Sequence, residues 1–237
     1  MSGRRPKYRG VVFDLDGTLV DTMGSVLEGL AAAVEPFRPR PGRAEVLRSL
    51  GGPSDECLLR LLGGRTHLTA ALRTYRRSQA AAERSLALFR GARTLLRELR
   101  AAGYPLGLWT GRERHMTEDR LRALALARQF DLVVCGDDLP SHKPDPEGLL
   151  RIVQRWDLHP SRVLFVGDSA QDFAGAQAAG VPLVAIDHDG VIAPARRQHP
   201  VAVVATPAAA FAWVRGALLA AGWQPARTVP AAGAQVT

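Results

Sequence analysis

Short apolar runs recur along the chain, separated by longer segments with helical periodicity. Six runs are apolar nearly throughout, which is typical of parallel strands covered on both faces. The predicted strands are Gly10–Phe13, Tyr104–Trp109, Leu132–Cys135, Val163–Val166, Leu183–Ile186 and Val201–Val204, and the predicted helices among them are Ala92–Ala102, Thr117–Arg128, Pro146–Trp156 and Asp172–Ala179. This alternation predicts an α/β fold with an open parallel sheet.

Residues 21–85 break the alternation, because they show helical patterns and no convincing strand. The predicted helices of this segment are Val26–Val34, Ala44–Leu50, Asp55–Leu62 and Leu68–Ala82. We therefore expect an α/β core of residues 1–20 and 86–223, with a small α-helical cap domain inserted at 21–85. The final segment, 224–237, is rich in Ala, Pro and Gly, and we expect it to be disordered.

Composition narrows the class of protein. The chain has 237 residues, 46% of them apolar, but no run approaches the ~18 apolar residues of a membrane helix. The basic N-terminus is not followed by a signal-like apolar stretch. Cys57 and Cys135 lie far apart without metal-like spacing, so we expect reduced cysteines in a cytoplasmic protein.

The net charge of +8 raises the question of nucleic-acid binding. Four of the positive charges lie within residues 4–9, and the others are spread without an aromatic-interleaved basic stripe. We therefore expect no nucleic-acid or membrane partner. Attraction of a small anionic substrate is the favoured use of this charge.

Polar side chains follow three of the predicted strands. Asp14 and Asp16 come after the first strand, and burying two acids there is costly unless something compensates. Thr110 and Asp168 follow two others. Ligands of open α/β sheets bind beyond the carboxyl ends of the strands, so we expect these side chains to converge on one crevice.

Four separated motifs carry the candidate chemistry. Each alone has an ordinary explanation as a turn, a strand exit or the start of a helix, but their joint occurrence at strand ends and nearby loops argues against that explanation. They are Asp14-Leu15-Asp16-Gly17-Thr18, Thr110-Gly111-Arg112, Lys143-Pro144-Asp145-Pro146, and the segment VLFVGDSAQDF, which contains Asp168 and Asp172. The clustered side-chain donors are all hard oxygens, which suits Mg²⁺.

In these four motifs the sequence resembles the haloacid dehalogenase-like superfamily, and within it the phosphoglycolate phosphatase-like group with a helical C1-type cap. The motifs match the DxDGT nucleophile motif, the Thr/Ser motif, the lysine motif and the GDxxxD metal motif of that family. The resemblance runs from about Val11 to Val184. It implies a Rossmann-like core and a Mg²⁺-dependent phosphatase that hydrolyses a small phosphate monoester through an aspartyl-phosphate.

The resemblance also implies a role for each matching residue. Asp14 is the expected nucleophile and Asp16 the general acid and base. Thr110 and Lys143 are expected to hold the phosphoryl group. The expected metal ligands are Asp14, Asp168 and the backbone carbonyl of Asp16, with Asp172 as a ligand or as an orienter of metal-bound water.

The expected substrate contacts extend into the cap. Gly17 and Thr18 form the turn that brings Asp16 to the site, and Arg112 either reaches the substrate or is a solvated surface residue. Gly51 and Gly52 are either part of a substrate-specificity loop or an ordinary helix–helix turn. The full set of predicted substrate-binding residues is Gly17, Thr18, Gly111, Arg112, Gly51 and Gly52.

Other reactions of the superfamily fit less well. Asp16 favours phosphoryl transfer over dehalogenation, and residues 22–85 contain no lysine for the Schiff base of phosphonate-cleaving relatives. The segment DTMGSVLEGL lacks the histidine that is usual in sugar-phosphate mutases. A mutase, a pyrophosphatase and a catalytically idle phospho-ligand or protein-binding relative remain alternatives, although no catalytic motif residue is missing. The sequence leaves the phosphate ester and the oligomeric state open.

Overall fold

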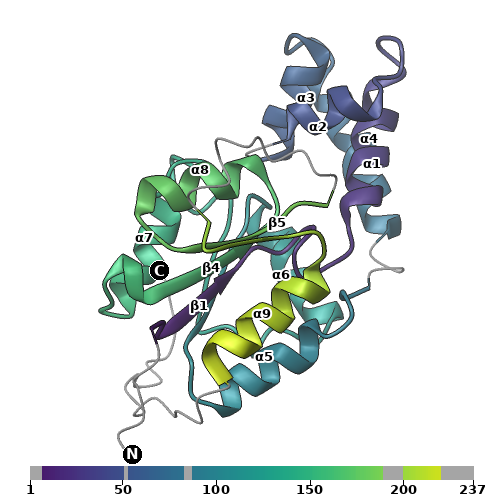
Figure 1. Ribbon diagram of the computed structural model, residues 1–237. Helices are drawn as coiled ribbons and strands as arrows, with labels where there is room; N and C mark the ends of the chain where they lie inside the picture. Colours follow the sequence, from purple (N-terminus) through teal and green to yellow (C-terminus); the bar gives the residue numbers. More distant parts are fainter. Residues whose placement is uncertain (1–6, 51–52, 83–86, 189–199, 220–237) are drawn as a thin grey trace, which may run out of the picture.

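A six-stranded parallel sheet lies at the centre of the computed structural model, which describes residues 7–50, 53–82, 87–188 and 200–219 (Figure 1). The strand order is β3-β2-β1-β4-β5-β6, and every neighbouring pair is parallel. The strands are β1 (Gly10–Phe13), β2 (Leu106–Trp109), β3 (Leu132–Val134), β4 (Val163–Gly167), β5 (Leu183–Ile186) and β6 (Ala202–Val204). This confirms the predicted α/β fold, with strand ends shifted by no more than two residues.

Helices cover both faces of the sheet (Figure 1). One face carries α5 (Ala92–Ala101) and α9 (Pro207–Leu219), and the other carries α7 (Glu147–Arg155) and α8 (Ala170–Ala179). Successive residues of β1 alternate between the two cores, because Val11 and Phe13 join the first cluster whereas Val12 joins the second. Burial on both sides explains why the strand sequences are continuously apolar.

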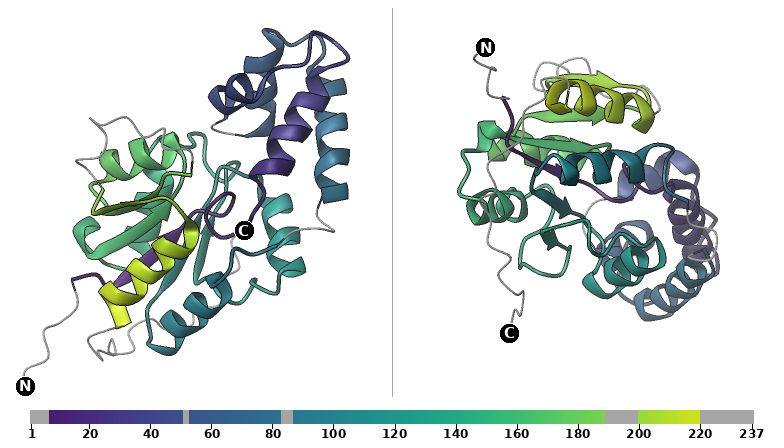
Figure 2. Two further views of the ribbon diagram at one scale, coloured as in Figure 1. Left: turned by 45° about the vertical axis from the view of Figure 1, so that its right-hand side comes forward. Right: turned by 90° about the horizontal axis from the view of Figure 1, so that it is seen from below.

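Four helices form a separate body with its own core (Figure 2). They are α1 (Met23–Val34), α2 (Arg43–Ser49), α3 (Ser54–Leu62) and α4 (Leu68–Ala82). We call these four helices the cap. Leu30, Leu58 and Leu61 are buried in its core. The exact domain boundaries, after residues 20 and 85, stay predictions. Residues 83–86 and the tail 224–237 lie outside the described part of the chain.

The chain crosses between core and cap at two adjacent places. Val20 and Leu88 form an antiparallel bridge. The Phe89 N–H donates to the Leu19 carbonyl at 3.0 Å, and the Asp21 N–H donates to the Ala87 carbonyl at 2.9 Å. The two crossings, residues 19–21 and 87–89, therefore run side by side at the base of the cap.

The helices α6 and α9 differ most from the sequence expectation, whereas α1 and α8 begin three and two residues before their predicted starts at Val26 and Asp172. α6 spans Arg114–Ala123 and ends before the predicted Arg128. Ala125 adopts a φ of 51°, and the buried Leu126 returns its N–H to the Leu121 carbonyl at 2.7 Å, which ends the helix. The sequence pattern predicts no bounds for α9 (Pro207–Leu219), because its alanine-rich sequence gives little contrast between apolar and polar faces. No helix within the described residues is long and apolar enough to span a bilayer.

Candidate active site

Asp14 and Lys143 form a buried ion pair at the carboxyl end of the sheet. Asp14 directly follows β1, and its N–H donates to the Val166 carbonyl of β4 at 2.9 Å. Lys143 Nζ donates to Asp14 Oδ1 at 2.7 Å and to Asp172 Oδ1 at 2.6 Å. Burial lowers the pKa of Lys143, but the two carboxylates outweigh that effect and raise it. Lys143 is therefore a fixed cation between two acids.

Asp168 and Asp172 complete an acidic cluster with Asp14. One carboxylate oxygen from each of the three lies within 4.8 Å of the others. Burial raises the pKa of Asp168 well above its usual value, and it raises the pKa of Asp14 to about 7 against the attraction of Lys143. The cluster therefore resists full ionisation when no further cation is present.

The acidic cluster fits a divalent metal ion. Three carboxylates and one ammonium leave two negative charges uncompensated, and the donors are hard oxygens, as Mg²⁺ prefers. Gly17, with a φ of 82°, passes close to Asp168, where an added Cβ would lie 2.1 Å from Asp168 Oδ2. A glycine is required at this position, because any side chain would displace Asp168.

The three acids are not equivalent. Asp172 Oδ1 accepts from Lys143, and its Oδ2 accepts from the Ser169 hydroxyl at 2.7 Å and, in the capping box of α8, from the Ser169 N–H at 3.0 Å. Asp168 Oδ1 accepts from the Thr18 hydroxyl at 2.8 Å. Asp14 and Asp168 line a cavity between the sheet and the cap, whereas Asp172 does not. This arrangement favours Asp14 and Asp168 as direct metal ligands and Asp172 as a positioning group.

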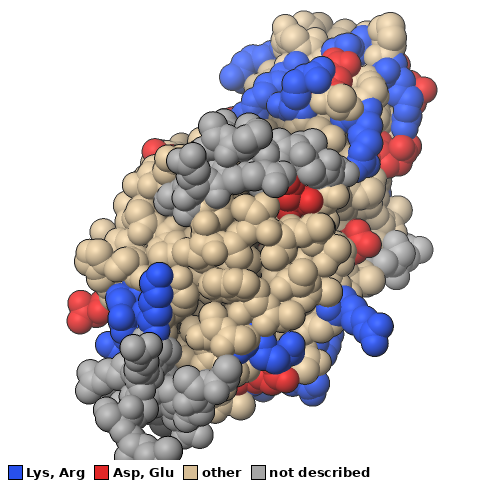
Figure 3. Space-filling view, in the orientation of Figure 1, with Lys and Arg blue, Asp and Glu red and all other residues tan. Residues whose placement is uncertain are grey.

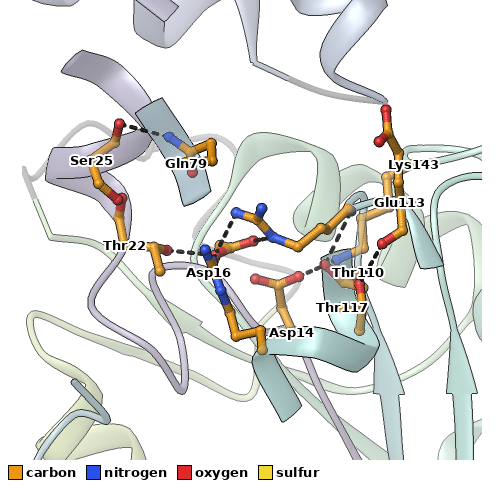
Figure 4. A network of polar contacts seen from close by, with 11 residues as sticks. Asp14, Asp16, Thr22, Ser25, Gln79, Thr110, Glu113, Thr117 and Lys143 are labelled. Carbon is orange, nitrogen blue, oxygen red and sulfur yellow. Dashed lines mark hydrogen bonds and ion pairs between the residues drawn. The ribbon is translucent and has the colours of Figure 1, made fainter. Parts of the chain in front are cut away.

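Asp16 is held by three side chains rather than by the acidic cluster (Figure 4). Arg112 binds it with two N–H groups, Nε to Oδ2 at 2.8 Å and Nη2 to Oδ1 at 3.1 Å. Arg120 Nη1 lies 2.5 Å from Oδ1, and the Thr22 hydroxyl donates to the same oxygen at 2.6 Å. Burial alone raises the pKa of Asp16, but the two guanidinium groups hold it well below its usual range.

This geometry settles the position of Arg112 and adds residues that sequence reasoning missed. The Arg112 side chain is 6% exposed, so it is not a solvated surface residue. Arg120 was missed because it stands among exposed arginines and acids in α6. Its spacing from Thr117 and Leu121, which share the buried face, was the available signal. Thr22 carries no comparable sequence signal.

A cavity lies between the sheet edge and the cap. Its core wall is polar and contains Asp14, Asp16, Thr110, Arg112, Lys143 and Asp168. Its cap wall is mostly apolar and includes Val26, Leu30, Leu50, Cys57 and Tyr75. A ligand in this cavity would turn a charged group toward the core and a short remainder toward the cap.

The other predicted substrate contacts divide into three groups. Thr110 directly follows β2, and Thr110 and Gly111 both line the cavity. Gly17 and Thr18 do not line it, and the fully buried Thr18 instead bonds Asp168. Gly51 and Gly52 lie outside the described residues, although Leu50 and Ser54 on either side line the cavity.

Polar contacts hold the cap against the core around the cavity. Ser54 donates to Glu113 Oε1 at 3.0 Å, and Gln171 Nε2 donates to the Leu50 carbonyl at 2.7 Å. His142 Nε2 lies 2.8 Å from Glu56 Oε1. In this conformation the cap therefore lies over the acidic cluster.

A parallel sheet that ends in this acid–lysine cluster under a helical cap defines the haloacid dehalogenase class of hydrolases. Residues 11–186 match the family model described as haloacid dehalogenase-like hydrolase, and the chain belongs to this family.

The similar proteins include phosphatases. A phosphoglycolate phosphatase from Shigella boydii is 34% identical over 209 residues, covering 76% of this chain and 81% of that protein. A solved putative haloacid dehalogenase-like hydrolase from Bacteroides fragilis has a TM-score of 0.74 at 26% identity, covering 84% of this chain and 98% of that one. A predicted phosphoglycolate phosphatase from Haemophilus somnus shares the fold, with a TM-score of 0.75 at 22% identity, covering 88% of this chain and 98% of that one.

Proposed function

We propose that this protein is a Mg²⁺-dependent phosphatase that hydrolyses a small phosphate monoester of the 2-phosphoglycolate type. The observation that carries the proposal is the contact of Lys143 with Asp14 and Asp172, with Asp168 in the same cluster and the cavity above it. The 34% sequence identity to a phosphoglycolate phosphatase adds support.

Asp14 is the proposed nucleophile. Its carboxylate oxygen forms a bond to phosphorus while the bond from phosphorus to the ester oxygen breaks, which leaves an aspartyl-phosphate and an alkoxide. Water then attacks the phosphorus of this intermediate while the bond from phosphorus to the Asp14 oxygen breaks, which releases inorganic phosphate and restores the carboxylate. Lys143 keeps Asp14 oriented and stabilises its charge, and Thr110 at the end of β2 donates its hydroxyl to a phosphoryl oxygen.

Asp16 is the proposed proton-transfer group. In the second half-reaction it takes a proton from the attacking water, a role that its ionised state suits. In the first half-reaction it protonates the leaving alkoxide, so it must acquire a proton and loosen its contact with Arg112 or Arg120. The Thr22 hydroxyl can keep the carboxyl group in place throughout.

Asp14, Asp168 and the backbone carbonyl of Asp16 would hold the Mg²⁺ ion, with Asp172 as a fourth ligand or as a group that orients a bound water. When bound, the ion neutralises charge on the phosphoryl oxygens and on the acids. Thr18 fixes the direction of Asp168 through its hydrogen bond, which assigns it a metal-positioning role rather than contact with substrate.

The features of the cavity support a small metabolite as substrate. Its apolar cap wall leaves few polar partners for a large sugar or nucleotide. Lys and Arg side chains gather over the cap helices in the view of Figure 3, and such a field attracts small anions. Cys57 and Cys135 are buried thiols, which supports a cytoplasmic location. We propose neither nucleic acid nor membrane as a partner.

Phosphate release from p-nitrophenyl phosphate tests this proposal. We expect turnover with Mg²⁺, none with EDTA, and a loss of about a thousandfold or more in Asp14→Asn. Asp119→Asn is the matched control, because this acid is 62% exposed and pairs only with Arg122 among the contacts described; it should keep full activity. Hydrolysis by Asp14→Asn at the wild-type rate would reject the nucleophile assignment.

A further inference from the structure

We propose that Arg112 selects the substrate by binding a carboxylate carried close to the phosphate group. This inference rests on the proposed phosphatase function and adds the residue that distinguishes one phosphate ester from another. In this proposal Arg112 releases Asp16 and binds the carboxylate of the substrate instead.

The position of Arg112 supports this role. It lies two residues after Thr110, the proposed phosphate-binding residue, and its side chain lines the cavity. Among the described residues that line the cavity, the cations are Arg112 and Lys143. Lys143 is held by two buried acids, whereas Arg112 is held by the single carboxylate of Asp16. Arg112 is therefore the cation better placed to bind a second negative group of a ligand.

The chemistry of the contact points to a carboxylate. Arg112 already binds the Asp16 carboxylate through Nε and Nη2 at 2.8 and 3.1 Å. A planar guanidinium binds carboxylates in this two-pronged way, whereas a lysine acts as a point charge. A substrate carboxylate can take the same two N–H groups when Arg112 turns from Asp16 toward the cavity.

The rest of the site tolerates this exchange. When Arg112 leaves, Asp16 keeps the Arg120 contact at 2.5 Å and the Thr22 hydrogen bond at 2.6 Å. The buried carboxylate is therefore not left without partners, which would be costly. A substrate without a second negative group cannot replace Asp16 as the partner of Arg112. Such a substrate therefore gains no binding energy from Arg112.

Arg120 provides the contrast. It binds the same carboxylate but is 0% exposed and does not line the cavity. With no accessible surface it cannot contact a ligand in this conformation. Arg120 is therefore a positioning residue for Asp16, and Arg112 serves both Asp16 and the ligand.

The experiment compares two esters that differ at one group. These are 2-phosphoglycolate and 2-hydroxyethyl phosphate, in which a hydroxymethyl group replaces the carboxylate. We expect wild type to prefer 2-phosphoglycolate in kcat/KM. In Arg112→Gln, kcat/KM should fall about a hundredfold for 2-phosphoglycolate and no more than about fivefold for 2-hydroxyethyl phosphate. The loss shared by both esters measures the effect on Asp16, and the excess measures recognition of the carboxylate.

Two further variants keep the test decisive. Arg112→Lys retains the charge without the two-pronged geometry, so it should lose selectivity in part, and it serves if Arg112→Gln folds poorly. Arg120→Lys should lower kcat/KM for both esters by the same factor. Equal losses for both esters in the Arg112 variants, or a wild type without preference, would overturn the inference while phosphatase activity on 2-hydroxyethyl phosphate still stands. A wild type that hydrolyses neither ester overturns both proposals.

Discussion

Lys143 Nζ lies 2.7 Å from Oδ1 of Asp14, and both side chains are buried. The contact joins the loop before α7 to the first residue after β1. It places a fixed positive charge next to the proposed nucleophile. Burial alone would drive Asp14 toward its neutral form, which cannot attack phosphorus, so Lys143 is required to keep a usable fraction ionised.

Replacing Lys143 by Met should destabilise the metal-free protein in a pH-dependent way. Burial raises the pKa of Asp14 to about 7, so near pH 5 this group is neutral and needs no cation. At pH 8 it ionises in wild type, whereas in the variant its ionisation is unpaired. We expect a loss of about 3 kcal/mol in the free energy of unfolding at pH 8 and about 2 kcal/mol at pH 5, where only the part due to ionised Asp14 is gone and the lost contact with Asp172 remains. Urea titrations in EDTA at both pH values measure this, and equal losses would contradict the prediction.

Asp16→Asn should lower stability most at neutral pH. The pKa of Asp16 is held below its usual range in the folded state, so its contribution is present above the unfolded pKa and is lost as the pH falls through the folded one. The variant leaves two buried guanidinium groups without their shared carboxylate. We expect a loss of about 3 kcal/mol at pH 7 that shrinks toward pH 3, measured by urea denaturation. A loss below about 1 kcal/mol at pH 7 would show that the pairs contribute little.

Mg²⁺ should stabilise the protein more at pH 8 than at pH 6. In the metal-free protein, burial raises the pKa values of Asp14 and Asp168, so a metal that binds near pH 6 must displace protons. We expect the midpoint Mg²⁺ concentration for the thermal shift to fall at least tenfold from pH 6 to pH 8. Asp119→Asn, at an exposed site, should show the same dependence. A midpoint Mg²⁺ concentration that does not change with pH would show that the ion binds outside the cluster of Asp14 and Asp168.

Thr18→Val should weaken metal binding without touching substrate binding. The variant keeps the shape of a fully buried side chain but removes the hydroxyl that donates to Asp168. Loss of such a supporting contact costs about tenfold or more in metal affinity. We expect the Mg²⁺ concentration for half-maximal activity to rise about tenfold, with KM for the ester unchanged at saturating Mg²⁺. If KM rose instead, the substrate-contact role of Thr18 would be favoured.

Much of the fold could be predicted because its physical signals are local. A strand covered on both faces must be apolar at nearly every position, so runs such as Val163–Val166 stand out. The meeting of Asp14, Thr110 and Asp168 in one cavity also follows, because strands that run parallel bring their carboxyl ends to one edge.

The features of the fold and site that the sequence did not predict depend on tertiary contacts. The role of Arg120 arises only when α6 packs with its Thr117–Leu121 face toward the sheet, and an arginine in a charged helix is more often exposed. The early end of α6 depends on the burial of Leu126, which no local pattern fixes. The burial of Arg112 likewise depends on a tertiary contact, because Asp16 lies 96 residues earlier in the chain and pairs with it only in the folded protein.

The adjacency of the two chain crossings, 19–21 and 87–89, has a consequence for how such a protein can evolve. An insert whose ends meet can be lengthened, shortened or exchanged without changing the register of any strand. The proposed catalytic acids and Lys143 lie on the sheet side of that junction. The contacts that the cap makes with a substrate can thus change with the helical insert, while the phosphate chemistry and Arg112 beneath it are retained.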